Sequence, residues 1–131
     1  HIASEAALKM MEIAYLPCIA YPGGELKHGP IALIEEGTPV IAIAPDDSHY
    51  PKMEANIREC ASRGANVILL TNKETPIKDY CARVIRTPIT DPFLSPFMSI
   101  MPLHLLAYRL AVRLDRNVDR PRNLAKSVTV V

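Results

Sequence analysis

Two apolar runs, PVIAIAP at residues 39–45 and NVILLT at residues 66–71, decide the fold class of this chain. Each run is short, continuous and bounded by turn-forming residues, which is typical of a strand buried on both faces of a sheet. Between them, Met53 and Ile57 recur at helical spacing on a segment that ends at Gly64. A strand, a helix and a second strand in this order predict two parallel strands joined by a crossover helix. We therefore expect an α/β fold, a parallel sheet with helices on both faces.

The remaining elements are predicted from periodicity and from helix-breaking residues. Strong helix formers dominate the first fifteen residues, and Pro17 stops that pattern. A third apolar run precedes a long apolar segment that contains two prolines. The expected elements are a helix at 2–15, a short strand at 16–21, a short helix at 28–35, a strand at 83–87 and a helix at 93–114 that Pro96 and Pro102 kink or split.

Composition and charge narrow the class of protein. The chain has 131 residues, one domain's worth, with a net charge of +1 and only 5% aromatic residues, which argues against nucleic-acid binding. Cys18, Cys60 and Cys81 are widely spaced and odd in number, which favours a reducing, cytoplasmic location over a disulfide framework or a metal site. The apolar runs are too short to cross a membrane. The chain starts at His1 on a helical pattern, so we expect a fragment of a longer protein.

Parallel α/β sheets bind ligands at the carboxyl ends of their strands, which here lead into residues 44–48 and 71–74. Neither turn is rich in glycine, and the sequence contains no GxGxxG or GxxxxGKS motif. Dinucleotide and ATP binding are therefore not expected.

Three charged residues, Glu5, Lys9 and Glu12, share one face of the first predicted helix. One interpretation is a solvated face supported by a weak i,i+4 ion pair. The other is a polar stripe on a helix packed nearly all round, where a carboxylate beside an ammonium can be tuned to move protons. The residues alone leave both interpretations open.

Two further residues carry groups suited to catalysis. His28 lies in the loop GGELKHGP at residues 23–30, where an imidazole can act as an acid or a base, although most loop histidines are simply exposed. Lys126 lies among apolar neighbours near the C-terminus, where partial desolvation would free its amine to form a Schiff base. His49 and His104 have no supporting neighbours in the sequence and receive no role.

The segments EAALKMMEI, AYPGGELKHGP and DRPRNLAKSVTV carry a resemblance to a known family. In this order, across residues 2–130, they resemble the carboxyl-terminal isomerase region of the glutamine:fructose-6-phosphate aminotransferases, also called glucosamine-6-phosphate synthases. The resemblance implies a sugar isomerase (SIS) domain, a three-layer αβα sandwich with a parallel sheet flanked by helices. It implies that residues 1–131 are the second SIS domain of a longer chain.

The resemblance also implies a role for each candidate residue. Lys126 matches the lysine that forms a Schiff base with the open-chain ketose, and Glu12 matches the carboxylate that moves a proton between C1 and C2. His28 matches a histidine that assists ring opening and comes from the neighbouring subunit. Glu5 and Lys9 match residues that complete the polar network around Glu12. Neither a metal nor an organic cofactor is implied.

Substrate and partners follow from the same resemblance. The substrate-binding residues would be Ala125, Lys126 and Glu12, with fructose 6-phosphate as substrate and glucosamine 6-phosphate as product. The partners would be a first SIS domain, a glutaminase domain and a second copy in a homodimer, with neither nucleic acid nor membrane involved. This sequence has no Ser/Thr-rich loop of the kind that holds the sugar phosphate in the family's first SIS domain. We therefore expect the isolated chain to be inactive or nearly so.

Two alternatives remain open on the sequence. A glucosamine-6-phosphate deaminase of the SIS family could share all three motifs. A non-catalytic sugar-phosphate sensor or dimerisation module would need neither the amine of Lys126 nor the carboxylate of Glu12, so their presence argues against it.

Overall fold

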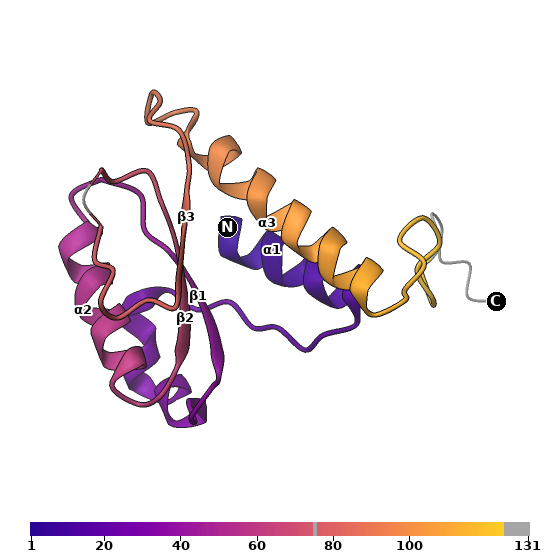
Figure 1. Cartoon of the computed structure of the whole chain (residues 1–131), viewed down its shortest axis with the longest axis horizontal. Helices are drawn as coiled ribbons and strands as arrows, with labels where there is room; N and C mark the ends of the chain where they lie inside the picture. The colour runs from indigo at the N-terminus through magenta and orange to yellow at the C-terminus, as the bar shows by residue number, and fades with distance from the viewer. Residues whose placement is uncertain (75, 125–131) are drawn as a thin grey trace. The chain divides into compact units, whose positions relative to one another are not determined.

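The computed structural model describes residues 1–74 and 76–124, and the chain forms two compact units (Figure 1). The helical unit comprises His1–Ala20 together with the chain from Ile100 onward, and the sheet unit comprises Tyr21–Ser99. The long helix α3, Ser95–Arg113, begins in the sheet unit and continues in the helical unit.

The sheet unit is built on three parallel strands in the order β1-β2-β3. They are β1 (Pro39–Ile43), β2 (Asn66–Thr71) and β3 (Arg83–Arg86), which confirms three of the four predicted strands and the predicted parallel pairing. In the register, Ile41 lies opposite Ile68. The central strand β2 has four of its six residues buried, as expected from its continuous apolar run.

The helix α2 (Tyr50–Ala61) connects β1 to β2 and packs against both strands. It carries a proline in its first turn, where a missing N–H costs nothing. Gly64 follows it with φ +88°, a left-handed conformation that glycine adopts without strain. The core of this unit consists of side chains from α2, β1, β2 and the residues next to them: Ala42, Ala44, Tyr50, Ile57, Cys60, Val67 and Leu69.

Two predictions for the first half of the chain were wrong. Residues 16–21 form no strand: they connect the helical unit to the sheet unit without a neighbouring strand to pair with. Residues 28–35 do not form one short helix. Two 3₁₀ helices, η2 (Gly23–His28) and η3 (Pro30–Leu33), meet instead at Gly29, whose φ of +141° no helix can accommodate.

The first predicted helix is confirmed, but it changes type along its length. α1 (Ile2–Lys9) is an ordinary α-helix, and it continues as η1 (Met10–Ala14), a π-helical segment. The segment ends at Tyr15, a non-glycine residue with φ +59°. Single π-helical turns inside α-helices are rare and frequently mark functional sites. Glu12 lies in this segment.

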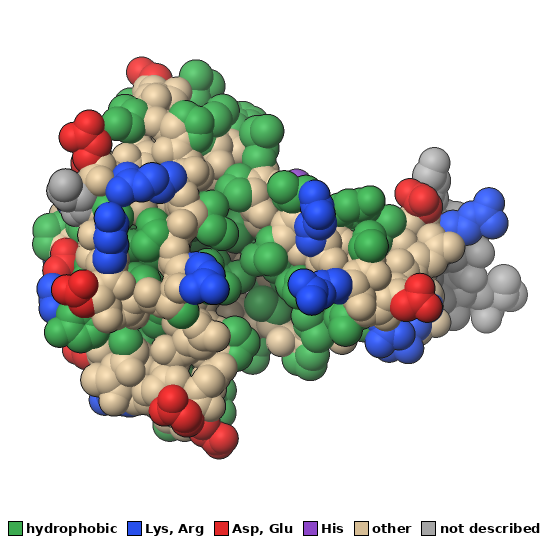
Figure 2. All heavy atoms as spheres, in the orientation of Figure 1, with side chains coloured by type: hydrophobic (Ala, Val, Ile, Leu, Met, Phe, Trp, Pro, Cys, Tyr) green, Lys and Arg blue, Asp and Glu red, His purple; other side chains and the backbone are tan. Residues whose placement is uncertain are grey.

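The predicted helix at 93–114 is confirmed as the continuous helix α3, so its two prolines do not split it. Pro96 lies in the first turn, where proline is tolerated, and Pro102 lies inside the helix. Large apolar side chains of α3 remain exposed, among them Phe97, Met101 and Leu105 at 59%, 63% and 55%. On the face of the molecule drawn in Figure 2, apolar side chains lie among separated basic and acidic ones, without one continuous charged field.

Candidate active site

The predicted charged stripe forms on the first helix. The Nζ atom of Lys9 lies 2.7 Å from Oε2 of Glu12 and 3.4 Å from Oε1 of Glu5, so one ammonium bridges two carboxylates. The exposed fractions of the three side chains are 40% for Glu5, 31% for Lys9 and 28% for Glu12. The stripe is therefore half-buried, intermediate between the solvated face and the enclosed cavity that the sequence left open.

The charge state of Lys9 follows from this geometry. Its hydrogen bond to Glu12 raises the pKa of the ammonium, partial burial opposes that effect, and attraction to both carboxylates adds to it. Lys9 thus stays protonated at neutral pH and holds the Glu12 carboxylate in place through a charge-assisted hydrogen bond. It is suited to orienting Glu12 and unsuited to acting as a base.

His104 joins this network, although no feature of the sequence pointed to a role for it. Its Nε2 atom lies 3.6 Å from Oε1 of Glu5, and its side chain is 45% exposed. His104 and Glu5 are ninety-nine positions apart and lie on different helices of the helical unit. Helical periodicity links only residues three or four apart, so no local signal could have paired them.

A shallow surface cavity of about 300 Å³, open to solvent, lies beside Glu12 within the helical unit. Met11, Glu12 and Tyr15 line it from the end of the first helix, and Arg122, Asn123 and Leu124 line it from the C-terminal segment. The backbone N–H of Arg122 donates a hydrogen bond to the hydroxyl oxygen of Tyr15 at 2.8 Å. Glu12 thus lines a cavity whose other wall is the segment that precedes Lys126 in the chain.

Two of the predicted site residues, Ala125 and Lys126, lie outside the described residues. His28 is described, and it belongs to the sheet unit. It is the last residue of η2 and its side chain is exposed. The neighbouring Lys27 forms an ion pair of 2.6 Å with Glu59, which links this end of η2 to α2 within the sheet unit.

The carboxyl edge of the sheet, the usual ligand position in this fold class, is occupied by internal contacts. The backbone N–H of Asp46 donates to Oδ1 of Asn72 at 2.7 Å, and Nζ of Lys73 donates to Oδ1 of Asp46 at 2.7 Å. This hydrogen bond to Asp46 is the main reason why the pKa of Lys73 is raised. Arg86 donates to the carbonyl oxygens of Lys73 and Glu74 at 2.9 and 2.8 Å. These groups hold the two turns together.

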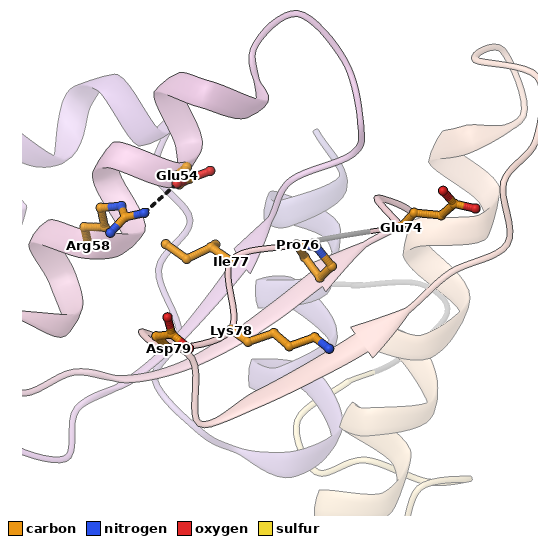
Figure 3. A pocket seen from close by; sticks show the side chains of 7 residues that line it. All are labelled: Glu54, Arg58, Glu74, Pro76, Ile77, Lys78 and Asp79. Atoms are coloured by element: carbon orange, nitrogen blue, oxygen red, sulfur yellow. Dashed lines mark hydrogen bonds and ion pairs between the residues drawn. The ribbon is translucent and has the colours of Figure 1, made fainter.

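A second cavity, of about 440 Å³, lies beside α2 in the sheet unit (Figure 3). Glu54 and Arg58 line it from α2, and the loop after β2 supplies the other lining residues. Its side chains carry both signs of charge, and Arg58 is already paired with Glu54 at 2.7 Å. The Glu12 cavity is therefore the better candidate for chemistry, because it brings a carboxylate residue of the charged stripe next to the C-terminal segment.

Across residues 1–74 and 76–124, no cluster of three metal-ligating side chains occurs. In the same part of the chain, no helix combines the length and the apolar character needed to cross a bilayer.

The fold and the site together define a parallel α/β domain that presents a half-buried carboxylate and ammonium beside a cavity. The chain belongs to the SIS domain family, whose family model matches residues 1–114. This confirms the expected fold class, a parallel sheet with helices in the αβα arrangement of SIS domains.

Individual relatives agree with this assignment. A glutamine–fructose-6-phosphate aminotransferase (isomerizing) of Methanosarcina acetivorans is 52% identical over 130 residues, which cover 98% of this chain and 21% of that protein. The solved C-terminal domain of glucosamine-fructose-6-phosphate aminotransferase from Francisella tularensis aligns with a TM-score of 0.85 at 38% identity, covering 91% of this chain and 34% of that one. A glucosamine-6-phosphate deaminase from Thermotoga maritima aligns with a TM-score of 0.73 at 26% identity, covering 98% and 37%. This chain spans about a fifth of the length of the curated relative.

Proposed function

We propose that residues 1–131 are the second SIS domain of a glutamine:fructose-6-phosphate aminotransferase, which converts fructose 6-phosphate and glutamine-derived ammonia to glucosamine 6-phosphate. The observation that carries this proposal is the position of Glu12, held at 2.7 Å by Lys9 and opening onto a cavity shared with Arg122–Leu124. Lys126 follows two residues later in the chain. The 52% identity to a relative of that name supports the same activity.

In the proposed reaction, Lys126 and Glu12 act in succession. The neutral amine of Lys126 attacks C2 of the open-chain ketose, and loss of water leaves a Schiff base. Ammonia then adds at C2 and the lysine amine departs, which leaves an imine on the sugar. Glu12 takes a proton from C1 and returns it to C2, while the C1 hydroxyl loses its proton and the imine nitrogen gains one, so the imine becomes an amine and C1 becomes the aldehyde of glucosamine 6-phosphate. A carboxylate on a rigid helix can reach two adjacent carbons.

The remaining residues have supporting roles in this proposal. Lys9, paired with Glu5 as well as Glu12, holds the Glu12 carboxylate in a fixed orientation. His28 assists ring opening in the active site of the neighbouring subunit of a homodimer, a role that suits its exposed position at the end of η2. Ala125 contacts the substrate.

A deaminase function is less well supported. The Thermotoga maritima deaminase is 26% identical to this chain, against 38% for the aminotransferase domain of Francisella tularensis and 52% for the relative from Methanosarcina acetivorans. The aminotransferase proposal also predicts that the isolated 131 residues form no glucosamine 6-phosphate, because a first SIS domain would supply the sugar-phosphate site.

Trapping of the Schiff base tests the proposal directly. The full-length protein is incubated with fructose 6-phosphate, without glutamine, in the presence of cyanoborohydride, which reduces an imine to a stable amine. We expect peptide mass spectrometry to find the sugar phosphate on Lys126, with loss of the adduct in Lys126→Met and full labelling in Lys52→Met, which removes an exposed lysine of α2. Labelling spread over several lysines, or none in the unaltered protein, would contradict the Schiff-base role.

A further inference from the structure

We propose that Tyr15 is a positioning residue that anchors the C-terminal segment, residues 116–124, against the helix that carries Glu12. The proposal rests on the proposed function for its catalytic consequence, because Lys126 follows this segment. Tyr15 itself has no assigned role in the proposed chemistry.

Tyr15 binds the segment through two different kinds of contact. Its hydroxyl oxygen accepts the backbone N–H of Arg122 at 2.8 Å, a hydrogen bond between residues 107 positions apart. Its ring lies 4.3 Å from the guanidinium carbon of Arg122 and 5.3 Å from that of Arg116, both within cation–π range. One side chain therefore fixes the segment at two points.

The backbone around Tyr15 explains how the side chain reaches the segment. The π-helical segment η1 ends at Tyr15, whose N–H bonds back to the carbonyl of Met10 and whose φ is +59°. A tyrosine held in the left-handed region is unusual, and it persists only where the surrounding contacts support it. The contacts of the Tyr15 side chain with Arg116 and Arg122 provide this support. The turn that ends the Glu12 helix also presents the anchor.

The segment itself is shaped to meet this anchor. Asp115, with φ +55°, lies in the turn that follows α3, and the N–H of Arg116 bonds to the carbonyl of Ala111. Oδ1 of Asn117 then accepts the N–H groups of Asp119 and Arg120 at 3.1 and 3.0 Å, which closes a turn. The chain next reaches Arg122. The internal hydrogen bonds set the shape of the segment, and Tyr15 sets where it lies relative to Glu12.

Three variants of the full-length protein separate the two kinds of contact. Tyr15→Phe removes the hydroxyl and keeps the ring, Tyr15→Leu removes both, and Arg122→Gln removes a cation and keeps the backbone N–H. Tyr108→Phe is the matched control, since Tyr108 is exposed on α3 and its hydroxyl makes no hydrogen bond to any described residue. Thermal unfolding, measured in parallel, shows whether each variant remains folded.

Amide hydrogen exchange and cyanoborohydride trapping provide the two measurements. We expect exchange in the peptide containing Arg122 to be about 5-fold faster in Tyr15→Phe and about 5- to 30-fold faster in Tyr15→Leu, the factors expected for one and two lost contacts. The rate of Lys126 trapping at saturating fructose 6-phosphate should fall in Tyr15→Phe and fall further in Tyr15→Leu. In a turnover assay of the same variants, kcat should change by a larger factor than KM. The control should match the unaltered protein in both measurements.

The two measurements also separate the anchor from the proposed function. If the exchange rate of the Arg122 peptide in Tyr15→Leu stays within 2-fold of the unaltered protein, Tyr15 does not anchor the segment. If exchange is faster but the rate of Lys126 trapping is unchanged, Tyr15 anchors the segment without any effect on catalysis. If the unaltered protein forms no Lys126 adduct, the proposed function fails and hydrogen exchange alone decides the anchor. If Tyr15→Leu does not fold, Tyr15→Phe and Arg122→Gln decide it by the same criteria.

Discussion

Substitution of Glu12 by glutamine removes the carboxylate from the proposed site and preserves the size of the side chain. In the structure this carboxylate accepts a hydrogen bond from Lys9 at 2.7 Å, and Glu12 lines the cavity of about 300 Å³. Glutamine can still accept a hydrogen bond from Lys9 but cannot take up a proton. The substitution thus removes the proposed chemistry and leaves the packing in place.

The expected effects on catalysis and on stability differ greatly in size. A positioned acid–base group contributes about 10² to 10⁴ in rate, so kcat should fall by that factor, equivalent to about 2.7 to 5.4 kcal/mol of barrier. Stability should change by only about 0.2 to 0.5 kcal/mol, because the lost ion pair joins half-exposed side chains on one helix. Lys9 also retains Glu5 at 3.4 Å.

The assay compares kcat for glucosamine 6-phosphate formation and the free energy of unfolding in the full-length protein. Glu54→Gln is the matched control, since Glu54 forms a 2.7 Å pair with Arg58 on α2 and is 32% exposed, close to the 28% of Glu12. The control should keep its activity. Schiff-base trapping on Lys126 should survive in Glu12→Gln, since Glu12 acts after that step in the proposed reaction. A kcat within 5-fold of the unaltered protein, or an equal loss in Glu54→Gln, would refute the role of Glu12.

Three further predictions concern the sheet unit. Leu69→Ala should lower the free energy of unfolding by about 2 to 5 kcal/mol in chemical denaturation, because Leu69 is fully buried. The control Leu33→Ala should change it by less than about 0.5 kcal/mol, because Leu33 is 67% exposed. Equal losses in the two variants would contradict the assigned core. Gly64→Ala should lower the free energy of unfolding by about 1 to 3 kcal/mol in the same assay, because the φ of Gly64 is +88° and a Cβ would lie 2.8 Å from Cα of Glu36. An unchanged denaturation midpoint would contradict this prediction. Burial raises the pKa of the Cys60 thiol, so the folded state keeps the thiol proton at a pH where the unfolded chain has lost it. The free energy of unfolding should therefore fall as the pH rises above about 9. Cys60→Ala should make this fall with pH less steep.

Local sequence pattern predicted most of the fold. β1, α2 and β2 follow from apolar runs and helical spacing, because burial on two faces leaves an uninterrupted apolar signature. The same reasoning failed at residues 16–21, where apolar character is present and no strand pairs with it. It failed again around Gly29, because a backbone angle of +141° is decided by packing and leaves no periodic trace.

The charged stripe of Glu5, Lys9 and Glu12 could be predicted because helical geometry alone brings these residues together. The sequence therefore determined the strands, the main helices, the charged helix face and, through its motifs, the family. Only the tertiary structure placed His104 beside Glu5, and the backbone of Arg122 on the hydroxyl of Tyr15. The physical reason is distance along the chain: periodicity reports neighbours a few residues apart, and a contact across 107 positions exists only once the chain has folded.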